Sequence, residues 1–398
     1  MNLLIFSFLV GQLNRYFWPG SIWGRVNLLD LALFIIIAVA LFRRQRPQLN
    51  PWLIGWLLVA IVSTIWGFTV VGWQGQPEAY FYLLRLVIYG VWFGLVGIVL
   101  KQRAYLMACV IGTGIAILGF IQLQLLPSIS LRLTELTGFD PHSGRLFSTF
   151  FDPNYAAIVL VLTLLMTLAL IWQGAGKARY YYLSAAAIQL VALLLTNSRS
   201  GLLALAVGLV IFVTAINWRY VLVVVLLATG VALFVPAIST RLTGALALDQ
   251  TSRARFDSWQ TATMVIDRQP ILGVGYNNYQ AATTILGRYQ PRLGKIALAA
   301  NASDSSLLTI WATTGLFGLV LALGWLLAEA SQAQPTTNRV QSSTKAKFSR
   351  SQLAARRSVI AALLVNSWFL NSLLWPFGLF LLALALTPFK VDTVTTEQ

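Results

Sequence analysis

The chain has 398 residues, of which 58% are hydrophobic and only 10% are charged, against a charged share of about 25% in soluble domains. A water-soluble protein of this length cannot hide so much apolar surface, whereas a bilayer solvates it. The formal net charge is +16, but the basic residues are spread over many short connections, which argues against a nucleic-acid partner. The single cysteine, Cys109, and the single histidine, His142, exclude a disulfide framework and Cys- or His-rich metal sites. We expect no metal and no cofactor.

Apolar runs of membrane-spanning length recur along the whole chain. Because a spanning helix needs about 20 apolar residues, the sequence predicts an all-α polytopic membrane protein of about 12 transmembrane helices, with a single integral-membrane domain over 1–398. The first run lacks a basic n-region and a small-residue cleavage site, so it is interpreted as a retained helix. The last two runs are short and also fit a re-entrant hairpin. The predicted spans are 2–14, 26–42, 52–71, 81–100, 104–126, 155–172, 180–196, 200–216, 219–236, 305–328, 357–372 and 374–389.

The orientation of the spans is predicted from lysine and arginine in the connections. If twelve helices alternate, all the basic connections fall on one side, which we interpret as cytoplasmic, with both termini on that side. The residues concerned are Arg43, Arg44, Arg46, Lys101, Arg103, Lys177, Arg179, Arg219, Arg339, Lys345, Lys347, Arg350 and Arg356.

Three long connections separate the spans. Residues 127–154 and 237–304 are expected to be extracytoplasmic loops, and the basic 329–356 a cytoplasmic, solvated linker. Loops this long are usually functional or disordered. Within the second loop, an apolar stripe that includes Trp259 predicts a short amphipathic helix at about 252–268, lying at the membrane surface or over a cavity.

Arginines gather at the predicted outer boundary, where the positive-inside rule makes them unfavourable. An ionisable group at membrane depth costs at least ~2.5 kcal/mol on insertion scales. The planar fork of arginine holds phosphate in two-point contact, so the sequence predicts a site for a phosphorylated anion. The candidate residues are Arg85, Arg145, Asp152, Asn154, Arg199, Arg255, Trp259 and Asp304.

Each candidate also has an ordinary structural explanation, and the sequence leaves both open. An arginine at a helix end can reach the lipid headgroups, and Asp304 can act as a helix N-cap before Ser305 and Ser306. The remaining alternatives are a surface charge for Arg145, Arg253 and Arg255, a pair with Glu78 or a carbonyl for Arg85, a solvated loop position for His142, and a tight turn rather than a nucleotide motif for Gly273-Val-Gly275.

Taken together and in this order, the segments over roughly 80–330 resemble the O-antigen ligase and O-antigen polymerase family of bacterial membrane glycosyltransferases. The resemblance rests on Arg145 ahead of Phe-Asp152-Pro-Asn154, on Ser198-Arg199-Ser-Gly201, on Arg255-Phe-Asp-Ser-Trp259 running to Pro270-Ile-Leu-Gly273-Val-Gly275, and on Thr314-Gly315-Leu-Phe-Gly318.

The resemblance implies a metal-independent enzyme of surface polysaccharide assembly in the bacterial plasma (inner) membrane. Members transfer a glycan from a polyprenyl-pyrophosphate carrier, such as undecaprenyl pyrophosphate, to a hydroxyl of a carbohydrate or lipid-linked acceptor. Arg145, Arg199 and Arg255 stand where the family's arginines hold the pyrophosphate. The expected partners are the carrier-linked donor, the acceptor and membrane lipid.

The sequence departs from the ligase pattern at one position. Ligases carry a His-Asn pair before the helix that ends in the Gly-x-x-Gly turn, whereas here Asp304 and Ser305 occupy the place eleven residues before Gly315. A carboxylate can also serve as acceptor base, so we expect Asp304 to take the acceptor proton in one inverting displacement. The departure favours a polymerase or an unassigned glycan transferase.

Two other functions remain open from the sequence. Twelve helices and an intramembrane Arg85 also fit a small-anion membrane transporter of the same wider family, although a carrier places charged or broken segments near the midplane. A catalytically inactive scaffold or a flippase partner is the third possibility.

Overall fold

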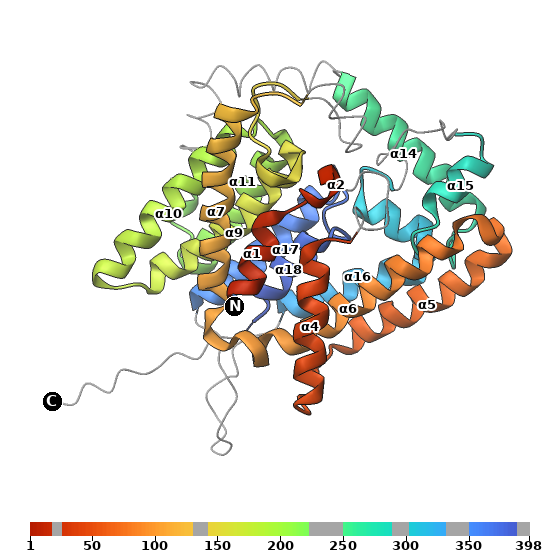
Figure 1. The fold of residues 1–398 in the computed structure, drawn as a ribbon, viewed down its shortest axis with the longest axis horizontal. Coiled ribbons are helices and arrows are strands. Elements are labelled where there is room, and N and C mark those ends of the chain that lie inside the picture. Colours follow the sequence, from red (N-terminus) through yellow and green to blue (C-terminus); the bar gives the residue numbers. More distant parts are fainter. Residues whose placement is uncertain (18–25, 130–141, 223–249, 289–301, 332–349, 388–398) are drawn as a thin grey trace.

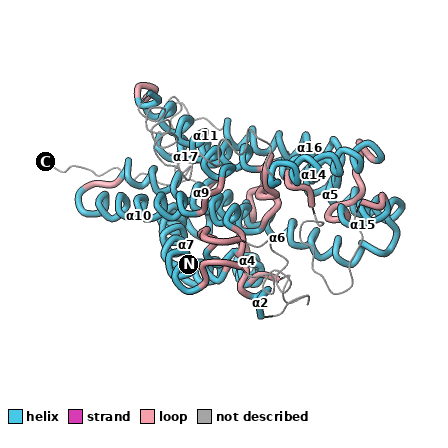
Figure 2. The backbone as a smooth tube through the Cα atoms, turned by 90° about the horizontal axis from the view of Figure 1, so that it is seen from above, coloured by secondary structure: helices cyan, strands magenta, loops and turns pink. Residues whose placement is uncertain are grey.

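The computed structural model describes residues 1–17, 26–129, 142–222, 250–288, 302–331 and 350–387. Within these ranges the chain consists of helices joined by loops (Figure 1, Figure 2). Seven of the described helices are long and apolar enough to cross a membrane. The predicted fold class, an all-α polytopic membrane protein, is confirmed. The count of about twelve spans stays a prediction, since 219–236 lies largely outside the described residues.

The seven long helices match predicted spans to within a few residues. Two of them begin at a capping side chain followed by proline: Asn50 accepts from the Trp52 amide, and Asp152 from the Asn154 amide. Proline suits the first helical position because its missing N–H is not needed there. The seven are α5 (Pro51–Val71), α6 (Gln76–Leu100), α7 (Ala104–Leu125), α9 (Pro153–Gln173), α10 (Gly176–Leu195), α11 (Arg199–Ile216) and α16 (Ser306–Ser331).

Helix α9 is the centre of the bundle. Its apolar window is 78% buried inside the protein, against 17% for α10. It packs against α7, α10, α11, α17 (Arg350–Asn366) and α18 (Pro376–Ala385) (Figure 1). A helix covered by protein on all sides needs no polar face, whereas the apolar outer side of α10 is left for lipid.

The first predicted span, 2–14, is wrong in length. Helix α1 (Asn2–Val10) covers nine residues, or about 13 Å at the α-helical rise, less than the roughly 30 Å of a hydrocarbon core. Gly11 has φ 59° and packs against Thr149, which ends the helix there. By contrast, α4 (Leu28–Phe42) lies where 26–42 was predicted.

The last two predicted spans, 357–372 and 374–389, are also wrong in their bounds. Helix α17 begins at Arg350 and ends at Asn366, earlier at both ends than predicted. A hydropathy window treats Arg356 as unfavourable for a span, which placed the predicted start after this residue. In the folded protein the Arg356 side chain is buried, so the helix includes it. Helix α18 has ten residues, all of them buried, so it is a half-length helix inside the bundle.

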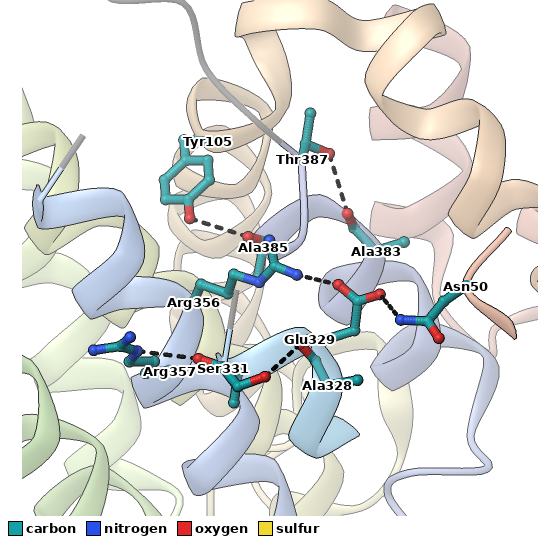
Figure 3. Close-up of polar contacts among 11 residues, drawn as sticks. Asn50, Tyr105, Ala328, Glu329, Ser331, Arg356, Arg357, Ala383, Ala385 and Thr387 are labelled. Carbon is teal, nitrogen blue, oxygen red and sulfur yellow. Dashed lines mark hydrogen bonds and ion pairs between the residues drawn. The ribbon is translucent and has the colours of Figure 1, made fainter. Parts of the chain in front are cut away.

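A buried polar cluster, here the Glu329–Arg356 cluster, joins the ends of five helices (Figure 3). Arg356 of α17 forms an ion pair with Glu329 of α16. Glu329 Oε1 also accepts from Asn50 Nδ2 at the start of α5 (2.9 Å). The Tyr105 hydroxyl, at the start of α7, donates to the carbonyl of Ala385, the last residue of α18 (3.1 Å).

Further contacts bring more helix ends together at this same end of the bundle. Arg350 Nε donates to the Ala215 carbonyl near the end of α11 (3.0 Å). Gln173, the last residue of α9, donates to Ser351 Oγ (2.7 Å). The ends of α9, α11 and α16 and the start of α17 therefore lie together at this end of the bundle.

Helix α16 is broken at Gly315, which has φ 70° and ψ −175°. The segment 269–278 docks into the break: the Val274 and Gly275 amides donate to the carbonyls three and two residues before Gly315, at 2.9 and 3.0 Å. Gly273 and Gly275 also have positive φ, and a Cβ on Gly273 would meet α16 backbone at 2.5 Å. The tight-turn explanation of Gly273-Val-Gly275 is confirmed.

The predicted amphipathic helix 252–268 is confirmed as α14 (Gln250–Arg268). Ala262, Val265 and Ile266 are buried, while Phe256 is 52% exposed. Helix α14 packs against α16 and against α15 (Tyr279–Ile285), and α15 in turn packs against α5 (Figure 1). The predicted loop 237–304 thus carries at least two helices.

Candidate functional site

The side chain of Arg145 docks onto the link between α10 and α11. Its Nε donates to the Thr196 carbonyl (2.8 Å), and its Nη2 lies 3.4 Å from both the Asn197 carbonyl and Asn154 Oδ1. Since Arg199 is the first residue of α11, Arg145 is held beside the segment that carries Arg199. Two arginine-bearing segments that are far apart in sequence therefore meet here.

Asn154 joins this group to the start of α11. Its Oδ1 accepts from Ser198 Oγ (2.8 Å), and Ser198 Oγ in turn caps α11 by accepting from the Gly201 amide (3.3 Å). Asp152 caps α9 by accepting from the Asn154 amide (2.6 Å). We call Arg145, Asn154 and 196–199 the Arg145 cluster. The residues of this cluster are positioned by the starts of α9 and α11 and by the guanidinium group of Arg145.

The backbone around the Arg145 cluster is strained. Ser148, Phe151 and Asn197 have φ values of 52°, 58° and 49°, in the left-handed region. Side chains other than glycine rarely adopt this conformation, and it costs of order 1–3 kcal/mol per residue. Such strain is concentrated at functional sites, where packing around the residue holds it in place.

Arg85 has a partner that the sequence did not indicate. Its Nη2 lies 2.8 Å from Asp30 Oδ2 of α4, and both side chains are about one-tenth exposed. Tyr89 donates to the other oxygen of Asp30 (3.0 Å), and the guanidinium carbon lies 4.8 Å from the centre of the Tyr82 ring. Asp30 was not among the partners that the sequence offered for Arg85, which were Glu78 or a carbonyl.

Helix α14 brings a second group of candidate residues together. The guanidinium carbon of Arg255 lies 5.7 Å from the centre of the Phe369 ring, and Trp259 contacts the same ring with centroids 6.2 Å apart. Arg253, two residues before, is exposed. The two arginines thus differ in exposure, and Arg255 lies against Phe369.

The backbone of Asp304 is hydrogen-bonded to α14, at a residue one helical turn after Arg255. Its backbone amide donates to Ser258 Oγ (2.9 Å). Ser305 stands at the N-cap of α16, and its Oγ accepts from the Leu308 amide (3.4 Å), so capping does not account for Asp304. Burial, and then the charge of Asp304, raise the pKa of Tyr279 above its ordinary value, so this nearby phenol stays protonated.

The segment 366–375, between α17 and α18, links the two groups, and sequence reasoning missed it. Phe369 packs on α14, while Trp375 packs on Tyr155, next to Asn154, with ring centroids 4.5 Å apart. Ser306 of α16 holds the segment between these two contacts: its amide donates to the Ser367 carbonyl (2.8 Å). The only sequence signal was a run of Asn, Ser and aromatic residues inside a predicted span.

Cations and a carboxylate therefore gather at the end of the bundle opposite the Glu329–Arg356 cluster. The Arg145 cluster supplies fixed positive charge beside Arg199. Helix α14 supplies Arg255 and holds Asp304. Such an arrangement can bind an anion and offer a proton acceptor beside it.

Comparison with known families gives a match. Residues 184–323 match the family model described as O-antigen ligase. This stretch belongs to the O-antigen ligase family. It includes Arg199, Arg255, Trp259 and Asp304, whereas Arg85, Arg145, Asp152 and Asn154 precede it and the 366–375 segment follows it. No curated protein matches the chain. The match over 184–323 confirms the resemblance and points to a role in surface polysaccharide assembly.

Proposed function

We propose that this protein transfers or polymerises a glycan from a polyprenyl-pyrophosphate carrier to an acceptor hydroxyl, on the extracytoplasmic side of the bacterial plasma membrane. The observation that carries the proposal is the docking of Arg145 beside the Arg199 segment, at the end of the bundle opposite the basic helix ends. Arginines retained at this end oppose the positive-inside rule and need a function.

The arginines act on the leaving group. As the bond between the anomeric carbon and the pyrophosphate oxygen breaks, negative charge grows on the pyrophosphate. Arg145, Arg199 and Arg255 would neutralise it by charge-assisted hydrogen bonds, an electrostatic contribution worth about 3–4 kcal/mol for a single well-placed donor. The step needs no metal ion and no nucleotide sugar.

Asp304 acts on the acceptor. It would take the proton of the acceptor hydroxyl as the oxygen attacks the anomeric carbon from the face opposite the pyrophosphate, so that one displacement inverts the configuration. A carboxylate can fill this role. Because ligases have histidine here, we favour polymerisation of carrier-linked repeat units over ligation.

The broken helix α16 bears on the small-anion transporter. A carrier uses unwound backbone to line its ion or substrate site. In this chain the carbonyls next to Gly315 accept hydrogen bonds from Val274 and Gly275. The break therefore anchors the segment 269–278, which leads from α14 to α15, and the observation favours surface chemistry.

Arg199→Gln is expected to lower glycan transfer by roughly 10²-fold or more, because a pyrophosphate-binding donor is lost. The measurement is carrier-linked glycan accumulating in a deletion strain that expresses the variant, with purified enzyme assayed in parallel. Arg219→Gln, at the opposite end of the bundle, is the control and should be silent. Full activity of Arg199→Gln would mean that this arginine only anchors a helix end.

The proposed topology places Gln280 outside the cell and Lys177 inside. A cysteine introduced at Gln280 is expected to react with an impermeant maleimide in intact cells, whereas one at Lys177 reacts only after lysis. The single native cysteine, Cys109, is buried and gives little background. The reverse labelling pattern would invert the orientation and remove the extracytoplasmic site.

A further inference from the structure

Several buried polar atoms in and beside the 366–375 segment have no hydrogen-bond partner within the described part of the chain. They are Oδ1 and Nδ2 of Asn366, Oδ1 of Asn371, and the indole Nε1 of Trp375 and of Trp259. Asn366 is completely buried. Buried polar groups are nearly always paired in native proteins, so each exception calls for an explanation. Other unpaired buried atoms lie elsewhere in the described residues, but among these residues only Asn366 has both of its amide atoms unpaired, and it lies beside the candidate site.

Aromatic rings lie along the same segment and include the two unpaired indoles. Trp259 and Phe369 are in contact, and Trp375 packs against Tyr155 (4.5 Å) and Phe150 (5.1 Å between centroids). A pyranose ring has apolar C–H faces and a rim of hydroxyls. Aromatic faces combined with amide and indole groups suit both features, because binding sites pair apolar surface with a few placed polar groups.

The segment also has the right position for a sugar. Ser306 Oγ donates to the Leu370 carbonyl (3.1 Å) and accepts from the Leu373 amide (3.0 Å), which fixes the segment two residues from Asp304. At the same time Phe369 lies against Arg255. The first sugar of the donor is bonded directly to the pyrophosphate, so it must lie between the phosphate-binding arginines and the base.

We propose that the 366–375 segment is the sugar subsite of the enzyme, in which the amides of Asn371 and Asn366 hydrogen-bond hydroxyls of the carrier-linked sugar. Asn371 is partly exposed, whereas Asn366 lies deeper. Both are positioning residues. The inference rests on the proposed function and adds specificity for the glycan to it.

The test uses Asn366→Leu and Asn371→Leu, which keep the side-chain volume and remove the amide. If the amides await a ligand, these variants should melt at the wild-type temperature or above it, because replacing an unpaired buried polar group by an apolar one of the same shape is neutral or favourable. Gln189→Leu is the matched control. The Nε2 of the buried Gln189 amide donates to Thr113 Oγ1 and Thr167 Oγ1 (3.3 Å each), although its Oε1 has no partner, so the loss of these donor bonds should lower the melting temperature.

Binding is measured with two probes on full-length protein in nanodiscs: bare undecaprenyl pyrophosphate, and the carrier-linked glycan extracted from a strain lacking the gene. Wild type should bind the glycan-bearing carrier about tenfold more tightly than the bare one, as expected for one or two added hydrogen bonds. Asn371→Leu and Asn366→Leu should abolish that preference and leave bare-carrier affinity unchanged. Gln189→Leu should keep it.

Retention of the preference in both asparagine variants would overturn the sugar subsite, as would a lower melting temperature in both, which would make the amides structural. No preference in the wild type would overturn it too, while leaving the proposed function standing. Failure of the wild type to bind bare carrier would instead overturn the proposed function, and the subsite with it.

Discussion

Asp304→Asn is expected to lower the rate of glycan transfer by about 10²- to 10⁴-fold, because asparagine cannot accept the acceptor proton. The fold should be unaffected. Ser305, not Asp304, caps α16, and the contact from Asp304 to Ser258 uses its backbone amide, which the substitution keeps. Single-turnover transfer and carrier affinity should be measured on the same preparation, since loss of a base lowers the rate and leaves binding intact.

Ser305→Ala is the matched control one residue away. It removes the capping hydroxyl and should cost about 1 kcal/mol of stability, with transfer preserved. Asp304→Asn should therefore lower the transfer rate and leave stability unchanged, whereas Ser305→Ala should lower stability and leave transfer unchanged. A fully active Asp304→Asn enzyme would remove Asp304 from the mechanism. Asp152 would then be the next candidate, although its side chain already caps α9, or the base would come from the phosphate of the substrate.

Hydropathy predicted the interior helices well, because spans such as α5 and α9 are long apolar runs with a capping residue and a proline at the start. Hydropathy failed to predict the helix bounds where a side chain is surrounded by other parts of the protein instead of by lipid or water. Arg356 is acceptable inside α17 only because Glu329 meets it from another helix. That partner lies 27 residues away in sequence, beyond the reach of any local window.

The candidate site was predictable in its residue types and only partly in its contacts. Arginines on the predicted outer side pointed to Arg145 and Arg199, and the structure brings their segments together. Arg85 could not be assigned, because Asp30 lies 55 residues earlier on another helix. The 366–375 segment escaped notice because its polar residues are embedded in apolar sequence that scores as membrane span.

The last expected result concerns the Glu329–Arg356 cluster at the other end of the bundle (Figure 3). Glu329→Gln keeps the shape of the side chain and an acceptor for Asn50, but leaves Arg356 as a buried charge without its counter-ion. Removing one partner of a buried pair costs about 3–5 kcal/mol. Arg356→Met should be similarly harmful, because it strands the carboxylate. Each single variant should therefore melt well below wild type in detergent.

The double variant, Glu329→Gln with Arg356→Met, is expected to recover most of that loss, since no unpaired charge remains and a buried pair replaced by uncharged groups is often neutral. The coupling measured in the double-mutant cycle should exceed about 2 kcal/mol, within the range found for contacting residues. Additive losses in the double variant would contradict a paired charge. Glycan transfer per folded molecule should be unchanged in all three variants, because the cluster ties the helix ends together at the end of the bundle away from the arginines.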